Sequence, residues 1–290
     1  SDSILWSWHV WVTDEDINNV IEITNHQNVK YNFMPVNLGQ CDGNTITYEE
    51  RSCKVKFIAG DQSKEITIKQ LANVIATGSN APFYQWGRKD PLYPSNGMGN
   101  TTKIWYDKEG IPSTANPMKG TFSAGNDCIK NCILNPNLMH NRYNGDYTYY
   151  NLWSADNKTT SANDNPVNKT IYDPCPVGFK LPASNAFTGF TTTGESVSSS
   201  TQVNGTWSSS EKGWYFYTNS EKTQSIFFPA LGYRSYSTMR PGSIGTQGCF
   251  WSAHPVAKGN NYYLRTSSVD VQPTYMVDRG FGYALRPCQD

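Results

Sequence analysis

The chain lacks several features that would identify whole classes of protein. Its 290 residues carry 24 basic and 24 acidic side chains, so no net field would attract nucleic acid or an anionic membrane. No stretch approaches the roughly 20 consecutive apolar residues that span a bilayer. The first residues have neither the basic start nor the apolar core of a signal peptide, and we expect a mature or trimmed chain.

Cysteine and histidine are too few and too scattered for a dense disulfide framework or a zinc site. Seven cysteines are spread over the whole length, and the pair in CIKNC (128–132) has no second pair at zinc spacing. We expect a local disulfide or two thiols there, and no metal or cofactor. A local bridge between Cys41 and Cys53 is also predicted, because the turn-rich segment DGNTITYEER lies between them.

Turn-forming residues are abundant, with 23 glycines, 16 prolines and long Asn/Ser/Thr-rich connections at 113–127 and 154–170. Such side chains bond locally to the backbone, so regular helix should be scarce. The apolar pieces are short and rich in aromatic or branched residues, and most of them predict strands. The expected strands are 6–12, 53–60, 64–75, 213–218, 225–231, 261–271 and 283–287.

Two short helices are expected, one within KQLANVIA (69–76) and one within PASNAFTGF (182–190), the second capped by Ser184 or Asn185. No clear linker divides the chain. The polar stretch 154–170 is either a boundary between two domains or a loop on one domain. We favour a single elaborated domain over 1–290, with insertions in its N-terminal part (1–153) and a ligand-binding core at 171–290.

Several motifs together resemble a known family. They are WSWHVWVTD (6–14), NLG (37–39), FYQWGRKDP (83–91), YDPCPVGFKLP (172–182), GCFWSA, YYLR and GYALRPC (282–288). In combination they are similar to the C-terminal domain of Bacteroides-type fimbrillins and surface adhesins. That domain is related to the Fibrobacter major paralogous domain, in the group of C-type-lectin-like and formylglycine-generating-enzyme-like folds.

The resemblance implies an α+β fold of the C-type-lectin-like kind, with small twisted antiparallel sheets, few short helices and long irregular loops. It implies a non-catalytic adhesin at the cell surface, on a pilus tip or anchored to the outer membrane. The partners it implies are a protein or glycan on a host, bacterial or phage-target surface, and other pilus subunits or an anchoring domain. By analogy with lectin-like folds, it pairs Cys175 with Cys288 in a disulfide.

The segment that ends in GCFWSAHP, followed by RGFGYALRP, also resembles the variable region of proteins diversified by retroelements. In GCFWSAHP, alternation along a strand places Phe250 and Trp251 on opposite faces. The similarity to the YWSS motif of that family implies that Trp251 lies in the core, which leaves Phe250 towards solvent. Tyrosine and arginine side chains often contribute much of the binding energy at protein interfaces. The predicted ligand-binding surface consists of Tyr233, Arg234, Tyr236, Phe250, His254, Tyr263 and Arg265.

Three further interpretations concern chemistry. In an enzyme related to the formylglycine-generating group, Cys249 near His254 would be a nucleophile or ligand pair, but no carboxylate or second thiol stands at a supporting spacing. A calcium-dependent lectin would need its Glu-Pro-Asn or Gln-Pro-Asp signature, and neither occurs. In YQWGRKDP, Arg88 and Asp90 are expected to form a buried or half-buried ion pair of the scaffold.

Overall fold

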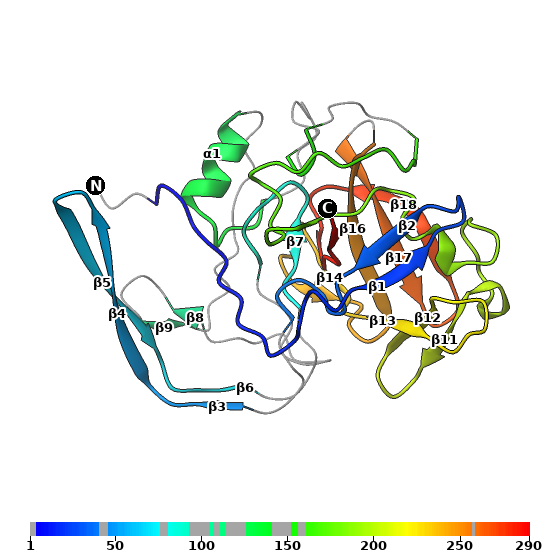
Figure 1. The fold of residues 1–290 in the computed structure, drawn as a ribbon, viewed down its shortest axis with the longest axis horizontal. Helices are drawn as coiled ribbons and strands as arrows, with labels where there is room; N and C mark the ends of the chain where they lie inside the picture. Colours follow the sequence, from blue (N-terminus) through cyan, green and yellow to red (C-terminus); the bar gives the residue numbers. More distant parts are fainter. Residues whose placement is uncertain are drawn as a thin grey trace.

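The structure is a computed structural model of the whole chain. It describes residues 4–40, 46–75, 81–92, 105–106, 111–113, 126–140, 152–155, 161–256 and 259–290. Within these ranges the fold is built mainly from small antiparallel sheets with few helices (Figure 1). The predicted scarcity of helix is therefore confirmed for the described residues. No helix among them is long and apolar enough to cross a membrane.

The elements follow one another in this order: β1 (Ile21–Thr24), β2 (Lys30–Phe33), β3 (Ile46–Tyr48), β4 (Arg51–Ala59), β5 (Gln62–Gln70), β6 (Asn73–Ile75), β7 (Tyr84–Gln85), β8 (Trp105–Tyr106), β9 (Pro112–Ser113), α1 (Asn126–Leu134), β10 (Phe179–Lys180), the 3-10 turns Thr188–Phe190 and Ser200–Gln202, β11 (Gly205–Ser208), β12 (Gly213–Tyr217), β13 (Ser225–Pro229), β14 (Tyr233–Arg234), β15 (Pro241–Gly242), β16 (Gln247–Pro255), β17 (Asn260–Ser267), β18 (Val271–Asp278), β19 (Gly282–Tyr283) and β20 (Cys288–Gln289).

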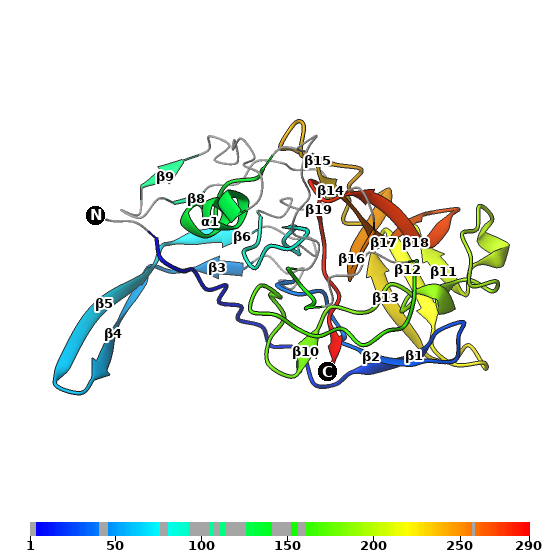
Figure 2. The same ribbon diagram turned by 90° about the horizontal axis from the view of Figure 1, so that it is seen from above.

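The described strands form four sheets of three or four strands and three two-stranded sheets. The larger sheets have the orders β1-β2-β20-β10, β11-β12-β13, β15-β14-β19-β7 and β16-β17-β18. Two of them join early and late parts of the chain, because β2 pairs with β20 and β7 pairs with β19. In Figure 2 the C-terminus accordingly lies next to β10 and β2.

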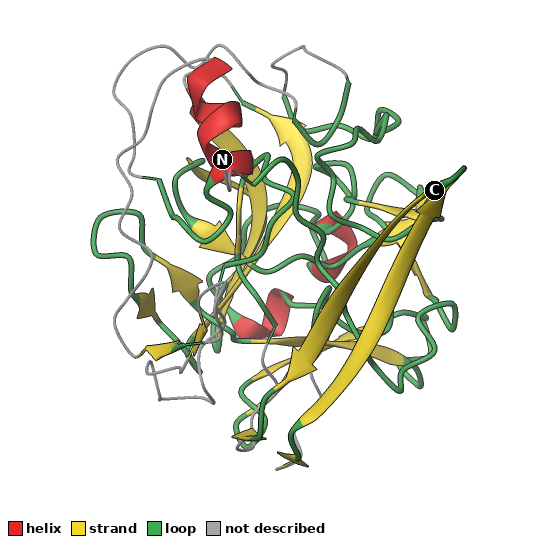
Figure 3. Cartoon of the chain, turned by 90° about the vertical axis from the view of Figure 1, so that its left-hand side faces the viewer, coloured by secondary structure: helices red, strands yellow, loops and turns green. Residues whose placement is uncertain are grey.

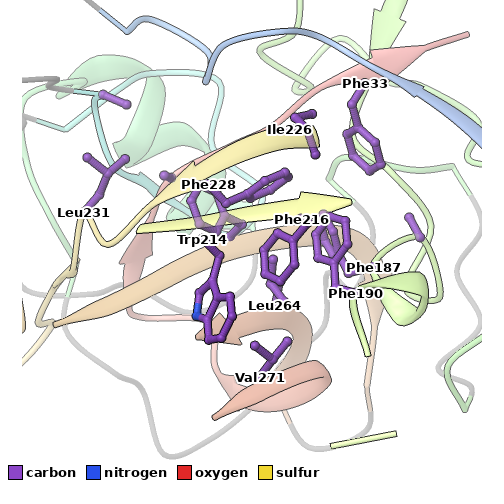
Figure 4. Packing of buried hydrophobic residues seen from close by; sticks show 14 of the residues in the cluster. Phe33, Phe187, Phe190, Trp214, Phe216, Ile226, Phe228, Leu231, Leu264 and Val271 are labelled. Atoms are coloured by element: carbon purple, nitrogen blue, oxygen red, sulfur yellow. The ribbon is translucent and has the colours of Figure 1, made fainter. Parts of the chain in front are cut away.

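One hydrophobic core lies between the sheet β11-β12-β13 and one face of the sheet β16-β17-β18 (Figure 4). The rings of Phe190 and Phe216 stack at 3.9 Å, and Phe228 meets Phe190 edge-on at 5.0 Å. Phe250 reaches this core from β16 and meets Phe228 edge-on at 4.9 Å. Aromatic pairs of this geometry add stabilisation beyond the area that they bury.

A second core covers the opposite face of the sheet β16-β17-β18. Trp251 is fully buried there, as expected, and donates from Nε1 to the carbonyl of Tyr84 at 2.8 Å. Tyr263 and Tyr283 pack beside it. Because both faces of β16 are covered, this strand has no side that faces water.

A buried arginine ties the two ends of the chain together. Arg286 is 1% exposed and donates to Asn37 Oδ1 at 2.7 Å, to the carbonyl of Pro35 at 2.9 Å and to that of Phe227 at 2.7 Å. Its guanidinium also lies 4.4 Å from the ring centre of Phe228. The planar five-donor group suits such a site, because several carbonyls can share its charge.

The structure corrects several predicted elements. Of the expected helix at 69–76, the described residues 69–75 are not helical, because Gln70 ends β5 and 73–75 form β6. Segment 182–190 forms turns and a 3-10 turn whose N-cap is Phe187, without a side-chain cap, rather than Ser184 or Asn185. Residues 6–12 form no strand. The helix α1, at the top of Figure 3, was not predicted, since polar residues precede it.

The predicted disulfide between Cys175 and Cys288 is not formed in this structure, where both are buried free thiols. The DPCP corner is instead organised by Asp173. Its carboxylate accepts from the backbone amide of Cys175 at 2.8 Å and from that of Leu181 at 3.1 Å. Cys41 lies outside the described residues, as does the side chain of Cys128, so the bridge to Cys53 and the CIKNC pair stay predictions.

The predicted ion pair in YQWGRKDP has a different partner. Asp90 is paired with Lys89 at 2.7 Å, and both side chains are buried. Arg88 is turned away and donates to the carbonyl of Pro136 at 2.8 Å and to that of Leu138. Adjacent residues can pair here because 89–90 form a bend rather than a strand, in which neighbouring side chains would alternate between two faces.

Candidate functional site

Four of the seven predicted binding residues are buried in the chain. Phe250 is fully buried, and Arg234, His254 and Tyr263 are 4–5% exposed. Their exposure to solvent was therefore predicted wrongly. Alternation along β16 is real, but it separates two cores instead of a core and a solvent face, as in strands that are covered on both sides.

His254 and Ser184 form a hydrogen-bonded pair within the scaffold. Ser184 Oγ lies 3.1 Å from His254 Nδ1 and donates to the carbonyl of Asn163 at 3.2 Å, while it accepts from the amide of Asn163 at 2.8 Å. The Ser184 side chain is 0% exposed. A hydroxyl so enclosed holds two loops together and presents no nucleophile at the surface.

Arg234 supports the turn that follows β14. It donates to the carbonyl of Met239 at 2.8 Å, and its guanidinium lies 5.9 Å from the ring centre of Phe83. Burial lowers the pKa of Arg234 to about 10. The two tyrosines near it in sequence, Tyr233 and Tyr236, are half-buried and remain accessible.

Tyr233 and Tyr236 belong to a connected series of rings that we call the aromatic ladder. Its members are Tyr236, Phe281, Tyr233, Tyr283, Tyr263 and Tyr275. Successive ring centres are 4.8 Å apart from Tyr236 to Phe281 and 5.4 Å from Phe281 to Tyr233. The series continues from Phe281 to Tyr283 at 5.7 Å, from Tyr283 to Tyr263 at 4.6 Å and from Tyr263 to Tyr275 at 5.8 Å.

The middle of the ladder is buried and its two ends are accessible. Tyr263 and Tyr283 rest on Trp251, with ring centres 5.8 and 4.4 Å away. At one end Tyr233, Tyr236 and Phe281 are half-buried, and at the other end Tyr275 is 46% exposed. A rigid core therefore holds aromatic rings at the surface, which reduces the entropy lost when they bind a partner.

Arg265 lies beside the exposed end at Tyr275. It donates to Asp270 Oδ1 at 3.1 Å and to Gln272 Oε1 at 3.0 Å, and its guanidinium lies 6.0 Å from the ring centre of Tyr275. These three contacts hold a half-buried charge in one position. Of the predicted binding residues, Tyr233, Tyr236 and Arg265 keep an accessible side chain.

Two backbone features place the rings. The register between β17 and β18 shifts between Tyr263 and Arg265. Such an irregularity changes the direction in which the side chains of β17 point. At Gly280 a Cβ would lie 3.0 Å from the Tyr236 ring and 3.0 Å from Asp278 Oδ1. The glycine thus allows the close approach of Tyr236 to the turn before β19.

The buried tyrosines of the ladder are neutral. Burial raises the pKa of Tyr283 well above its ordinary value, and it likewise raises the pKa of Tyr263. Tyr263 and Tyr283, in the middle of the ladder, are therefore uncharged over the whole range of physiological pH.

Sequence reasoning missed Phe281 and Tyr275 as site residues. Tyr275 opposes Tyr263 in the register of β17 and β18, and Phe281 contacts Tyr236 although they are 45 positions apart. The aromatic residues in DRGFGYALRP were the feature of the sequence that could have indicated these site residues, but only the pairing of the strands identifies which rings are in contact. Within the described ranges, no group of three or more His, Cys, Asp or Glu side chains is placed to hold a metal ion.

Comparison of the chain with protein-family models, with curated proteins and with solved structures gives no match.

Proposed function

We propose that the chain is a non-catalytic binding module that grips its ligand through the accessible ends of the aromatic ladder. The single observation that carries the proposal is the continuous contact of six rings, backed by Trp251 and accessible at Tyr236, Phe281 and Tyr275. Rigid aromatic side chains give large contact area at low entropic cost, and they also suit the apolar faces of sugars.

The fold and setting that go with this proposal come from the family resemblance. We propose a C-type-lectin-like arrangement, in an adhesin of the cell surface or of a pilus tip, whose ligand is a protein or glycan of another surface. Diversification by a retroelement is part of the same proposal. The many small antiparallel sheets support it at the level of architecture.

The alternative, an enzyme that uses Cys249 with His254, finds less support in the local chemistry. Cys249 is 1% exposed, and burial raises the pKa of its thiol to about 12. A thiol with such a pKa is almost entirely protonated at neutral pH, whereas the thiolate is the nucleophile. His254 Nδ1 is hydrogen-bonded to Ser184.

A screen on glycan and extracellular-matrix arrays identifies the ligand, and three variants then test the site. Tyr236→Ala and Tyr275→Ala each remove one accessible end of the ladder. Tyr215→Ala removes a ring of comparable accessibility from the sheet β11-β12-β13 and serves as the matched control. If the truncated ring is a binding hot spot, the variant should weaken binding by about 1–3 kcal/mol, which raises Kd roughly 5- to 150-fold.

The two ladder variants report on separate ends, so the pattern locates the ligand. Loss of affinity in one or both, with Tyr215→Ala unchanged, supports the proposal. Unchanged affinity in both ladder variants would refute it. If thiol alkylation of the native protein abolishes ligand binding, the result instead favours the enzyme that uses Cys249 with His254.

A further inference from the structure

Exposed apolar side chains gather on two segments near one end of the molecule. Among the described residues, seventeen large hydrophobic side chains are exposed, of which five belong to residues 4–12 and five to residues 57–74. Figure 1 shows both segments on the left, where the β4–β5 hairpin projects from the body. Apolar side chains concentrated in this way indicate an interaction surface.

The first segment belongs to no strand or sheet of the described residues. In residues 4–12, which we call the N-terminal segment, Trp8, Val10 and Val12 are 80%, 80% and 86% exposed, while the residues between them face the body. The inner side is fastened by Trp11 Nε1, which donates to the carbonyl of Gln40 at 3.0 Å, and by His9 Nδ1, 2.8 Å from the hydroxyl of Tyr84. Within the described ranges, no backbone–backbone hydrogen bond involves this segment.

The second segment is a sheet with too few strands. In the hairpin, Cys53 faces Ile68 and Val55 faces Ile66, which gives one face that is largely apolar. Phe57, on the same face, is 56% exposed. Among the described strands, β4 pairs with β5 alone, so the outer edge of each is unpaired. An isolated two-stranded hairpin is marginally stable in water, and an unpaired edge readily accepts another strand.

We propose that the N-terminal segment of one copy of this chain adds as a strand to an edge of the β4–β5 hairpin of a second copy. The two elements match in length, since residues 4–12, β4 and β5 each comprise nine residues, about 30 Å at the rise of a strand. Strand addition pairs the backbone groups of both elements. The exposed side chains of Trp8, Val10 and Val12 extend the apolar face of the hairpin.

The N-terminal segment itself, 4–12, contains no Asp, Glu, Lys or Arg, but the residues directly after it carry charge opposite to that of the hairpin. Residues 4–16 contain three acidic residues and no lysine or arginine, for a net charge of −3. The hairpin, 51–70, contains five basic and two acidic residues, for a net charge of +3. The three acidic residues, Asp14, Glu15 and Asp16, are all exposed. Opposite charges steer the two elements together and disfavour the pairing of two hairpins.

The two surfaces differ, so the contact is heterologous and each bound copy leaves one strand and one hairpin open. Such contacts produce open chains unless the rotation between copies closes a ring. An edge about 30 Å long and about 10 Å thick offers about 300 Å² per partner, below the roughly 800 Å² of a stable complex. The association is therefore weak and depends on concentration.

Sedimentation analysis over a wide range of protein concentration tests the proposal. The wild-type chain should form dimers and longer species at high concentration. Val10→Asp blocks the strand and Ile66→Asp blocks the hairpin, and each alone should raise the dissociation constant at least about tenfold. Val177→Asp, at a side chain that is 98% exposed elsewhere, is the matched control and should assemble as the wild type does.

A mixture of the two blocked variants gives the decisive result. Val10→Asp retains the hairpin and Ile66→Asp retains the strand, so the mixture should form dimers but no longer species. A wild-type chain that stays monomeric at every concentration overturns the proposal. Dimers that persist in Val10→Asp would also overturn it, because they would indicate pairing of hairpins. Binding of a monomeric chain to vesicles of anionic lipid through its hairpin would overturn it as well.

Discussion

Replacement of Phe250 by alanine separates a ring that lies in a core from a ring that lies on a surface. In the structure Phe250 is fully buried, opposes Leu264 across the sheet and meets Phe228 edge-on at 4.9 Å. Removal of a large buried aromatic side chain costs about 3–5 kcal/mol, from lost transfer energy and the cavity left behind. We expect Phe250→Ala to be destabilised by that amount.

The corresponding change in melting temperature follows from the length of the chain. The entropy of unfolding is about 2.1 cal/mol/K per residue, so that of a chain of 290 residues is about 0.6 kcal/mol/K. A loss of about 4 kcal/mol then lowers Tm by about 7 °C. Tyr275→Ala is the control, because its side chain is 46% exposed, and its Tm should fall by no more than about 2 °C.

Calorimetry on both variants and on Trp251→Ala decides the matter. Phe250→Ala and Trp251→Ala should melt early together, because they enter the two cores on opposite faces of β16. If Trp251→Ala melts early while Phe250→Ala melts with the wild type, the face that carries Phe250 is exposed, and the assignment of two cores is wrong.

The remaining predictions concern thiols and protons. Native alkylation should label Cys53 rapidly, because it is exposed, whereas Cys175 and Cys288 should react only after unfolding, because both are buried. A peptide joining Cys175 to Cys288 under non-reducing conditions would contradict their assignment as thiols. Burial lowers the pKa of His9 below 6.5 in the folded state, although Asp90 opposes the shift. The unfolded chain then binds more protons near that pH, so stability should rise with pH up to about 6.5 and fall in acid. In His9→Phe, urea midpoints measured at pH 5 and pH 7.5 should differ less than in the wild type, and an unchanged difference would remove His9 as the cause.

The sequence alone located several strands, among them β12, β13 and β17 in the C-terminal half. Short aromatic runs between turn formers placed β12 and β13 to within a residue or two, and β4 equally well. These are local signals, since β-branched and aromatic residues favour strands wherever Gly, Pro and Asn bound them. Alternation together with the YWSS resemblance assigned Trp251 to the core, and its burial confirms that assignment.

Alternation does not reveal how many faces of a sheet are covered. Phe250 and Trp251 alternate as predicted, yet both are buried, because the sheet β16-β17-β18 lies between two cores. The second cover comes from distant residues such as Phe190, Phe216 and Phe228, and no local pattern in GCFWSAHP records their approach. The same tertiary packing buried His254 against Ser184, 70 positions away.

Residue contacts across the chain were likewise decided by tertiary structure. Tyr236 and Phe281 lie in separate segments of the sequence. Only the turn before β19 brings their ring centres to 4.8 Å from each other. Lys89 and Asp90 pair at a bend of the chain that follows β7. Composition and spacing decide which residues favour strands, turns or burial, whereas the fold decides which of them meet, because contact depends on the paths of segments far apart in sequence.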